Sequence, residues 1–179
     1  MIVYPSVTQV LQPYADFSMI KPDVLQAASE RGTAVHDACF AYATGLPSFG
    51  MDDAVKGYFE SFRKWFDKVV AEVLLCEDRI IDDALGFHGE PDLVCRYKDG
   101  DVVLIDVKTP IAKSKSWRLQ MAGYAHLVRR IKDIPLNRIG SLRLSPSGGT
   151  PKVDWYEGSR DQDFAVFMSA LNVYRYFNS

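Results

Sequence analysis

Apolar side chains recur at helical spacing through the first third of the chain. Ser6 precedes the apolar run 7–11 and is expected to cap a short helix there. A second helix is predicted over about 22–44, interrupted near Gly32. A third is predicted over about 51–73, where one apolar stripe forms a core face without chemistry. The stripe consists of Val55, Phe59, Phe62, Phe66, Val69 and Val70.

The pattern then changes to that of strands. Residues 73–76 and 79–81 predict one strand, and residues 91–98 predict another. Asp99-Gly100-Asp101 lies between two apolar runs and predicts a hairpin turn, because Asp-Gly readily adopts positive φ angles. The returning strand 102–107 is almost continuously apolar and β-branched, so we expect it in the sheet centre with both faces covered.

The last third returns to helix and strand signals in turn. A helix is predicted over about 117–131, strands over 139–144 and 152–156, and a final helix over about 161–176. This order of elements predicts an α/β fold in which helices flank a small mixed sheet.

The composition is that of one globular domain with a full-sized core. Of the 179 residues, 47% are hydrophobic and 25% are charged. We expect a single domain over 1–179, with a helical part over about 1–72 and the sheet, later helices and site over about 73–179.

Neither a membrane span nor a secretion signal is indicated. No run approaches the ~20 apolar residues that a span requires, and the N-terminus lacks a basic segment followed by an apolar one. We therefore expect a cytoplasmic protein. Cys39, Cys76 and Cys95 lack the paired spacing of metal sites, and we interpret them as small buried side chains.

The net charge of -2 does not indicate nucleic-acid binding, but the cations are unevenly distributed. Residues 108–132 contain no Asp or Glu. Such a run is usually a solvated helix face. It begins, however, at the lysine that ends the strongest motif of the chain, where a polyanion would need compensating charge. The cations are Lys108, Lys113, Lys115, Arg118, Arg129, Arg130 and Lys132.

That motif is an acidic residue and a lysine, one position apart, at the end of the apolar strand. Side chains two apart in a strand point to the same face, so Asp106 and Lys108 project together. A charged pair at the end of a buried strand is costly unless it is matched or used. An isolated pair is explained by a strand end that emerges into solvent, so its context decides the interpretation.

The context is Asp92, fourteen positions before Asp106 (106 − 92 = 14). If residues 92–98 pair with 102–108 around the turn, two carboxylates converge at one end of adjacent strands. Such oxygen ligands suit Mg²⁺ or Mn²⁺, which also bind phosphate oxygen. Lys108 would orient or activate the attacking water and offset developing negative charge, while the metal polarises the phosphate.

The order Pro91-Asp92 followed by Asp106-Val107-Lys108 resembles the signature of the PD-(D/E)XK nuclease superfamily. The resemblance implies a restriction-endonuclease-like core, with a mixed central sheet flanked by helices. The chain is similar to phage and prophage members related to lambda exonuclease and to CRISPR-associated RecB-like nucleases.

Two further motifs resemble the RecB-like branch of this superfamily. The segment from Arg31 to His36 resembles its N-terminal histidine motif. Gln120 and Tyr124 resemble its Gln-x-x-x-Tyr motif, and their spacing places both on one helix face. The match spans residues 31–124 in family order.

The resemblance also implies roles for these residues. Four groups would hold Mg²⁺ or Mn²⁺: the side chains of His36, Asp92 and Asp106 and the backbone carbonyl of Val107. Lys108 would position the nucleophile, and Gln120 and Tyr124 would hold the substrate or that lysine. The cysteine cluster that binds an iron–sulfur cluster in some relatives is absent from the sequence, so we expect no such cluster.

Other polar residues near these motifs stay open or are interpreted as structural. Glu77 could point into the same cleft or lie at the surface. Glu90 is expected to face away from Asp92, which argues against a ligand role. We interpret His88 and His126 as structural.

Contacts to DNA are expected around the helix that follows the lysine. Trp117 and Arg118 would stack on or contact a strand, with packing at the helix start as the alternative. The cation-rich run would grip phosphates without reading bases, so binding should weaken with salt. The candidate contacts are Arg31, Lys113, Lys115, Trp117 and Arg118.

Together these features predict a Mg²⁺- or Mn²⁺-dependent deoxyribonuclease with DNA as its partner. An exonuclease of recombination, repair or phage DNA processing is the first choice, because the resembling branch is rich in them. A structure-selective endonuclease is the second. A binding module without catalysis is the third, and the intact acidic pair and lysine argue against it. Some relatives encircle DNA as rings, so oligomeric state and a recombination partner protein stay open.

Overall fold

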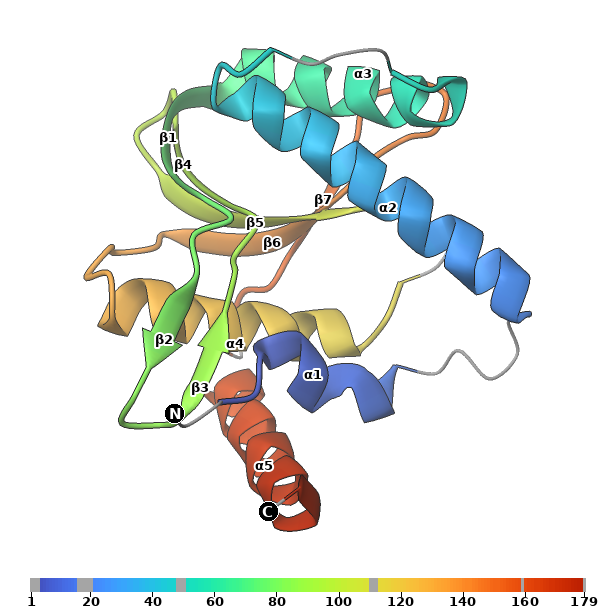
Figure 1. The fold of residues 1–179 in the computed structure, drawn as a ribbon. Coiled ribbons are helices and arrows are strands. Elements are labelled where there is room, and N and C mark those ends of the chain that lie inside the picture. Colours follow the sequence, from blue (N-terminus) through green and yellow to red (C-terminus); the bar gives the residue numbers. More distant parts are fainter. Residues whose placement is uncertain (1–3, 16–20, 48–50, 110–112, 159, 179) are drawn as a thin grey trace.

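The computed structural model describes residues 4–15, 21–47, 51–109, 113–158 and 160–178, with helices on both sides of a β-sheet (Figure 1). The helices are α1 (Val7–Leu11), the 3-10 helix η1 (Gln12–Tyr14), α2 (Pro22–Ala43), α3 (Asp53–Val69), α4 (Ser116–Arg130) and α5 (Arg160–Asn178). The strands are β1 (Val70–Cys76), β2 (Ile80–Asp82), β3 (Phe87–Gly89), β4 (Leu93–Tyr97), β5 (Val102–Lys108), β6 (Arg138–Arg143) and β7 (Lys152–Trp155). None of the helices in this described part is long and apolar enough to cross a membrane.

Five strands form the central sheet in the order β1-β4-β5-β6-β7. Strands β5 and β6 run parallel, joined by a connection through α4, and the other neighbours are antiparallel. The short strands β2 and β3 pair with each other as a separate hairpin. The predicted α/β fold with a mixed central sheet flanked by helices is therefore confirmed, and β5 is the middle strand.

The hairpin between β4 and β5 sets the register on which the site depends. Gly100 in its turn has a φ of 98°, a conformation that favours glycine. Leu93 lies opposite Ile105, and Arg96 lies opposite Val102. The predicted hairpin is confirmed, and it brings the start of β4 next to the end of β5.

Strand β5 separates two hydrophobic cores, because successive side chains point to opposite faces of the sheet. Val102 and Leu104 join a core with residues of α1, α4 and α5. Val103, Ile105 and Val107 join a second core with residues of α2 and α3. Figure 1 shows the same layers, with α2 and α3 on one side of the sheet and α4 on the other.

A capping box holds the short helix α1 in place. The hydroxyl of Ser6 accepts the backbone N–H of Gln9 at 3.1 Å, and Oε1 of Gln9 accepts the backbone N–H of Ser6 at 2.8 Å. Val7, Val10 and Leu11 are buried in the core shared with α4. The predicted cap is confirmed, and α1 is fixed beside α4.

Three predictions of local structure were wrong. Helix α2 runs without a break through Gly32, although glycine lowers helix stability by about 1 kcal/mol. A Cβ at Gly32 would lie 3.7 Å from Oγ1 of Thr109, so the helix passes close to the end of β5. Helix α3 ends at Val69, earlier than predicted, because the following residues pair with β4. Residues 80–82 form β2 in a different sheet instead of continuing β1.

Leu104→Ala should destabilise the protein, because Leu104 is fully buried in the middle strand. We expect the free energy of unfolding to fall by about 2 to 5 kcal/mol, the usual range for truncating a buried leucine. Leu46 is 63% exposed, so Leu46→Ala is a matched control that should change stability by less than about 0.5 kcal/mol. Urea unfolding followed by circular dichroism measures both, and equal stability of the two variants would contradict the assigned core.

Candidate active site

Asp106 and Lys108 project from β5 toward the face of the sheet that α4 covers, as their spacing predicted. Asp106 is 1% exposed. Nζ of Lys108 lies 3.1 Å from Oδ1 and 2.9 Å from Oδ2 of Asp106. Burial by itself would lower the pKa of Lys108, but the negative charges of Asp106 and Asp92 outweigh it and raise that pKa. The lysine is therefore charged at neutral pH.

Asp92 reaches the same place from the loop that leads into β4. The hairpin register, continued by one residue, puts Asp92 opposite Asp106. Oδ2 of Asp92 accepts the backbone N–H of Val107 at 2.7 Å. Burial, followed by the charge of Asp106, raises the pKa of Asp92 to about 6, although nearby cations and that hydrogen bond oppose the rise. Two carboxylates share one pocket, and one lysine does not fully offset their repulsion.

His36 approaches the end of β5 from α2, on the other side of the sheet. Its Nε2–H donates to the carbonyl oxygen of Val107 at 2.9 Å, and its Nδ1 lies 3.8 Å from Oδ2 of Asp92. Within the described ranges, no three His, Cys, Asp or Glu side chains are grouped closely enough to form a metal site by themselves. His36 therefore lies beside the two carboxylates without forming a three-residue cluster with them.

The donor set nevertheless suits a hard divalent cation once the backbone oxygen is included. In the neutral imidazole whose Nε2–H donates to Val107, the lone pair is on Nδ1, which lies 3.8 Å from Oδ2 of Asp92. A cation there would also relieve the repulsion that raises the pKa of Asp92. The residues present could hold Mg²⁺ or Mn²⁺.

Helix α4 supplies Gln120, which contacts the lysine, and Tyr124, which contacts Gln120. Oε1 of Gln120 accepts a hydrogen bond from Nζ of Lys108 at 3.1 Å, and its Nε2 donates to the hydroxyl of Tyr124 at 3.3 Å. Burial and the two aspartates raise the pKa of Tyr124, so its hydroxyl stays protonated. The ring of Tyr124 packs against Gly89, where an added Cβ would lie 2.7 Å from Cε1.

A second hydrogen-bonded chain, which the sequence did not indicate, reaches Asp106 from the neighbouring strand. Ser141 on β6 is paired with Asp106 and donates its hydroxyl to Oδ2 at 3.4 Å. The hydroxyl of Tyr156 donates to that of Ser141 at 3.1 Å. Asp106 is thus contacted from its own strand and from β6.

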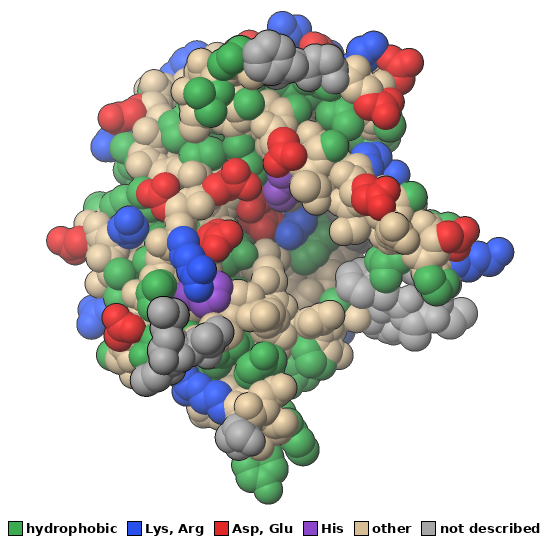
Figure 2. Space-filling model, in the orientation of Figure 1, with side chains coloured by type: hydrophobic (Ala, Val, Ile, Leu, Met, Phe, Trp, Pro, Cys, Tyr) green, Lys and Arg blue, Asp and Glu red, His purple; other side chains and the backbone are tan. Residues whose placement is uncertain are grey.

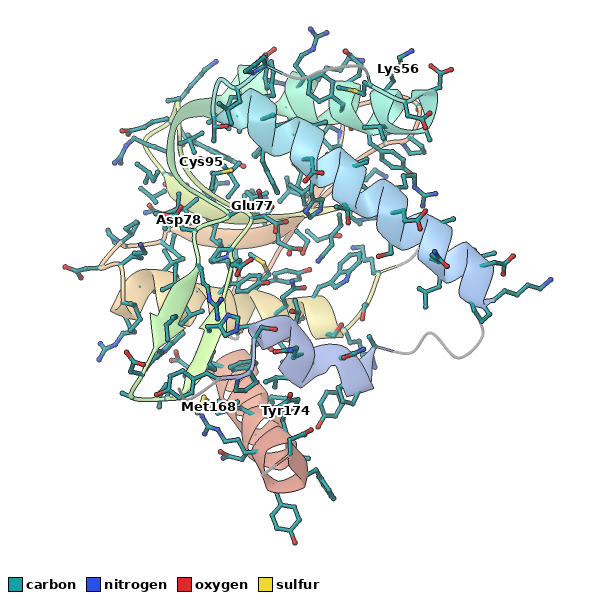
Figure 3. All side chains as sticks on the ribbon, in the orientation of Figure 1. Lys56, Glu77, Asp78, Cys95, Met168 and Tyr174 are labelled. Atoms are coloured by element: carbon teal, nitrogen blue, oxygen red, sulfur yellow. The ribbon has the colours of Figure 1, made fainter. Side chains whose placement is uncertain are left out.

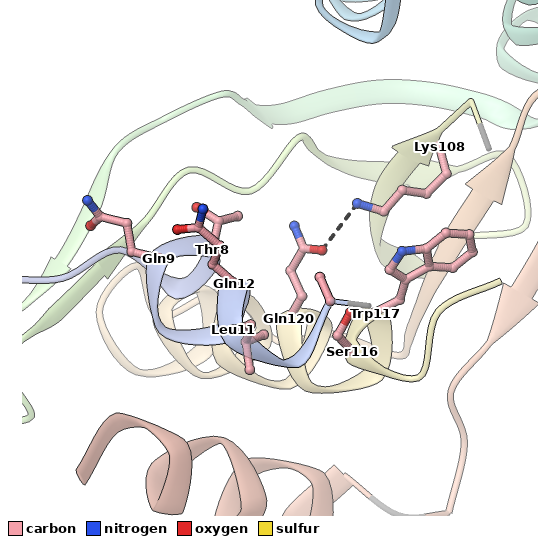
Figure 4. Close-up of a pocket in the computed structure, with 9 residues that line it drawn as sticks. Thr8, Gln9, Leu11, Gln12, Lys108, Ser116, Trp117 and Gln120 are labelled. Carbon is pink, nitrogen blue, oxygen red and sulfur yellow. Dashed lines mark hydrogen bonds between the residues drawn. The ribbon is translucent and has the colours of Figure 1, made fainter. Parts of the chain in front are cut away.

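Two cavities open beside these side chains, and α1 lines both. The lysine cavity has a volume of about 410 Å³, and its lining includes Thr8, Gln9, Gln12, Lys108, Trp117 and Gln120 (Figure 4). The aspartate cavity has a volume of about 470 Å³, and its lining includes Thr8, Gln9, Glu77, Glu90, Asp92 and Tyr124. Figure 2 shows this face hollowed, with acidic side chains gathered around the hollow. A role for α1 was not predicted, because the cavity walls are formed by segments that are distant in the sequence.

Two glutamates line the aspartate cavity together with Asp92. Glu77 lies where β1 ends (Figure 3), and its backbone N–H donates to the carbonyls of Pro91 and Asp92, each at 3.2 Å. Burial raises the pKa of Glu77. The expectation that Glu90 faces away from Asp92 was wrong, because side chains two apart on an extended chain point to the same side, and both residues line this cavity.

The two histidines interpreted as structural have different surroundings. His126 contacts Oδ2 of Asp82 through Nε2 at 2.8 Å and stacks on Phe164, away from the carboxylates of the site. His88 lines the aspartate cavity. The sequence offered no signal for that position, because β3 belongs to the separate hairpin.

The candidate DNA contacts differ in their surroundings. Acidic residues from other elements pair with two of them: Lys113 with Asp154, and Arg118 with Asp163. The charge run therefore has acidic partners that are distant in sequence.

The other candidates lie on either side of the end of β5. Arg31 lies over the ring of Tyr58, with its guanidinium carbon 5.8 Å from the ring centroid. Lys115 is exposed at the start of α4. The ring centroid of Trp117 lies 5.7 Å from Nζ of Lys108, so Trp117 borders the site directly.

Comparisons with known proteins bear on the fold. No family model and no curated protein matches the chain. A crystal structure of a candidate exonuclease from Eubacterium rectale matches with a TM-score of 0.50 and 14% identity, over 81% of this chain and 65% of that one. LHK-Exo, crystallised in complex with dAMP, matches with a TM-score of 0.36 and 13% identity, over 95% of this chain and 86% of that one. The first match shows a shared α/β fold, and this chain spans 65% of the length of that protein.

Asp92→Asn should stabilise the protein at neutral pH in the absence of divalent cations. Burial and Asp106 raise the pKa of Asp92 from 3.8 to about 6, so ionisation costs more free energy in the folded chain than in the unfolded chain. The stability from this group is complete below pH ~4 and is lost as pH rises through ~6. We expect Asn to raise the free energy of unfolding by about 1 to 3 kcal/mol at pH 7 and by little at pH 4.

Asp83→Asn is the matched control, because Asp83 is exposed in the turn between β2 and β3. Denaturant unfolding at both pH values, in a chelating buffer, compares the variants. A less stable Asp92→Asn protein at pH 7 would show that the aspartate is not under electrostatic strain.

Proposed function

We propose that this chain is a metal-dependent nuclease of the RecB-like branch of the PD-(D/E)XK superfamily, and that it hydrolyses phosphodiester bonds in DNA. The observation that carries the proposal is the meeting of Asp92, Asp106 and Lys108 in one pocket. Two buried carboxylates beside one ammonium disfavour folding, and a catalytic use accounts for them. The order of motifs and the fold shared with the Eubacterium rectale protein support the same reading.

The proposed metal ligands are His36, Asp92, Asp106 and the carbonyl of Val107. When bound there, Mg²⁺ or Mn²⁺ supplies Lewis-acid polarisation of the scissile phosphate. Binding would require ionised Asp92, whose pKa of about 6 lies below physiological pH. His36 could bind the cation through Nδ1, the ring nitrogen nearer Asp92, while its Nε2–H keeps the hydrogen bond to the carbonyl of Val107.

Lys108 is proposed to position the attacking water and to offset negative charge that develops on the phosphate. Its ammonium is held by Asp106 and Gln120, so it is oriented before substrate arrives. Tyr124 orients the Gln120 amide in turn. Because its pKa is raised, Lys108 would act as a positively charged ammonium and not as a neutral general base.

DNA is the proposed substrate, and exonucleolytic cleavage in recombination, repair or phage DNA processing is the favoured mode. The likeness to a candidate exonuclease structure supports this choice over a structure-selective endonuclease. An exonuclease requires a free end, so it should degrade linear DNA and spare closed circular DNA.

Asp106→Asn and Lys108→Ala should each reduce Mg²⁺- or Mn²⁺-dependent cleavage of linear DNA by at least about 100-fold. The first removes an anionic metal ligand, and the second removes the ammonium that offsets negative charge on the phosphate. Their thermal unfolding should remain cooperative. Gel assays on labelled linear, closed circular and single-stranded DNA, with metal or with chelator, measure the loss and the need for an end.

Asp83→Asn and Lys68→Ala are the matched controls, because they make the same chemical changes at exposed positions. Both should cut as the parent protein does. Undiminished cleavage by Asp106→Asn or Lys108→Ala would place the chemistry elsewhere.

Titration with Mn²⁺ should show binding that Asp92→Ala abolishes, because that variant removes an anionic ligand from a site with few others. Isothermal calorimetry measures the binding, and a rise in the melting temperature with Mn²⁺ gives an independent readout. Equal Mn²⁺ affinity in Asp92→Ala and Asp83→Asn would locate the ion outside the pocket.

A further inference from the structure

We propose that the lysine cavity holds an unpaired nucleobase of the substrate strand, stacked on Trp117, next to the phosphate that is cleaved. This inference rests on the proposed nuclease function and specifies the substrate further, as a single strand or an unpaired end.

The cavity is continuous with the catalytic lysine. Nζ of Lys108 contacts Asp106 and also lies 5.7 Å from the ring centroid of Trp117. Figure 4 shows Lys108, Trp117 and Gln120 along one wall, with Gln9 and Gln12 of the N-terminal segment across from them. A group seated here would lie next to Lys108, whose ammonium contacts Asp106.

The chemistry of the lining suits a base better than a phosphate. Among the described residues that line the cavity, Lys108 carries the charge, and its ammonium is already occupied by Asp106 and Gln120. The other polar groups are uncharged amides and hydroxyls, including those of Thr8 and Gln12. A nucleobase has flat apolar faces for an indole and a polar edge for amides, and stacking of this kind is tolerant of sequence.

Size and charge around the cavity favour an unpaired base. Its volume of about 410 Å³ lies in the range of sites for single small molecules. A paired base is enclosed in the duplex and would have to be extruded to enter. Lys113 and Arg118, two of the expected phosphate contacts, pair with Asp154 and Asp163, so part of their positive charge is already neutralised within the protein.

The matched substrates are a short oligothymidylate and a fully abasic strand of the same length, which carry the same phosphates. The parent protein should cleave the first with a kcat/KM about 10- to 100-fold higher, the expected contribution of stacking. Trp117→Leu should reduce this ratio to within about threefold of unity, and Trp117→Phe should retain most of it. The ratio is taken within each protein, so a general loss of activity does not affect it.

Binding is followed separately by tryptophan fluorescence without metal. Trp65 is buried, and Trp155 is covered by Arg138, whose guanidinium lies 4.6 Å from its ring centroid. Oligothymidylate should therefore quench emission in the parent protein through Trp117, and the abasic strand should not. Trp117→Leu should lose the quenching.

An unchanged substrate ratio in Trp117→Leu, or equal quenching by both strands, would overturn the proposal. Base-dependent quenching without any metal-dependent cleavage would support the base site and refute the nuclease function. The two proposals can therefore fail independently.

Discussion

The ion pair between Asp106 and Lys108 is the interaction on which the site depends. A carboxylate with 1% exposure in the middle strand of a sheet would be prohibitively costly alone. The lysine two residues later shares its face, and a hydroxyl from β6 and an amide from α4 complete the contacts. The charge can be buried because three elements of the fold meet at this strand end.

The surroundings of that pair divide into regions of different chemistry. On one side, three acidic residues and one arginine, Arg79, line the aspartate cavity, so carboxylates outnumber the guanidinium there. On the other side, an indole and uncharged amides face the lysine cavity. Helix α1 borders both cavities, so the first described segment of the chain helps to form their walls.

Local pattern was enough to place Asp106, Lys108 and Asp92, because strand alternation and one Asp-Gly turn fix their relative positions. His36 could be placed only through the resemblance to a known family, since nothing near it in the sequence points to β5. Ser141 was not predictable, because its role follows from the parallel pairing of β6 with β5. The same limit applies to charge: Lys113 looked unpaired until the fold brought Asp154 beside it.

Gly89 has a consequence for how the molecule tolerates change. The ring of Tyr124 fills the space that any side chain at position 89 would need, and Leu127 lies 3.0 Å from the same point. The β2-β3 hairpin and α4 can therefore pack this closely only while position 89 has no side chain. An alanine there, in the same cavity wall as Asp92, would require the ring of Tyr124 to shift, and that shift would disturb the hydrogen bond by which Tyr124 orients Gln120, the amide partner of Lys108.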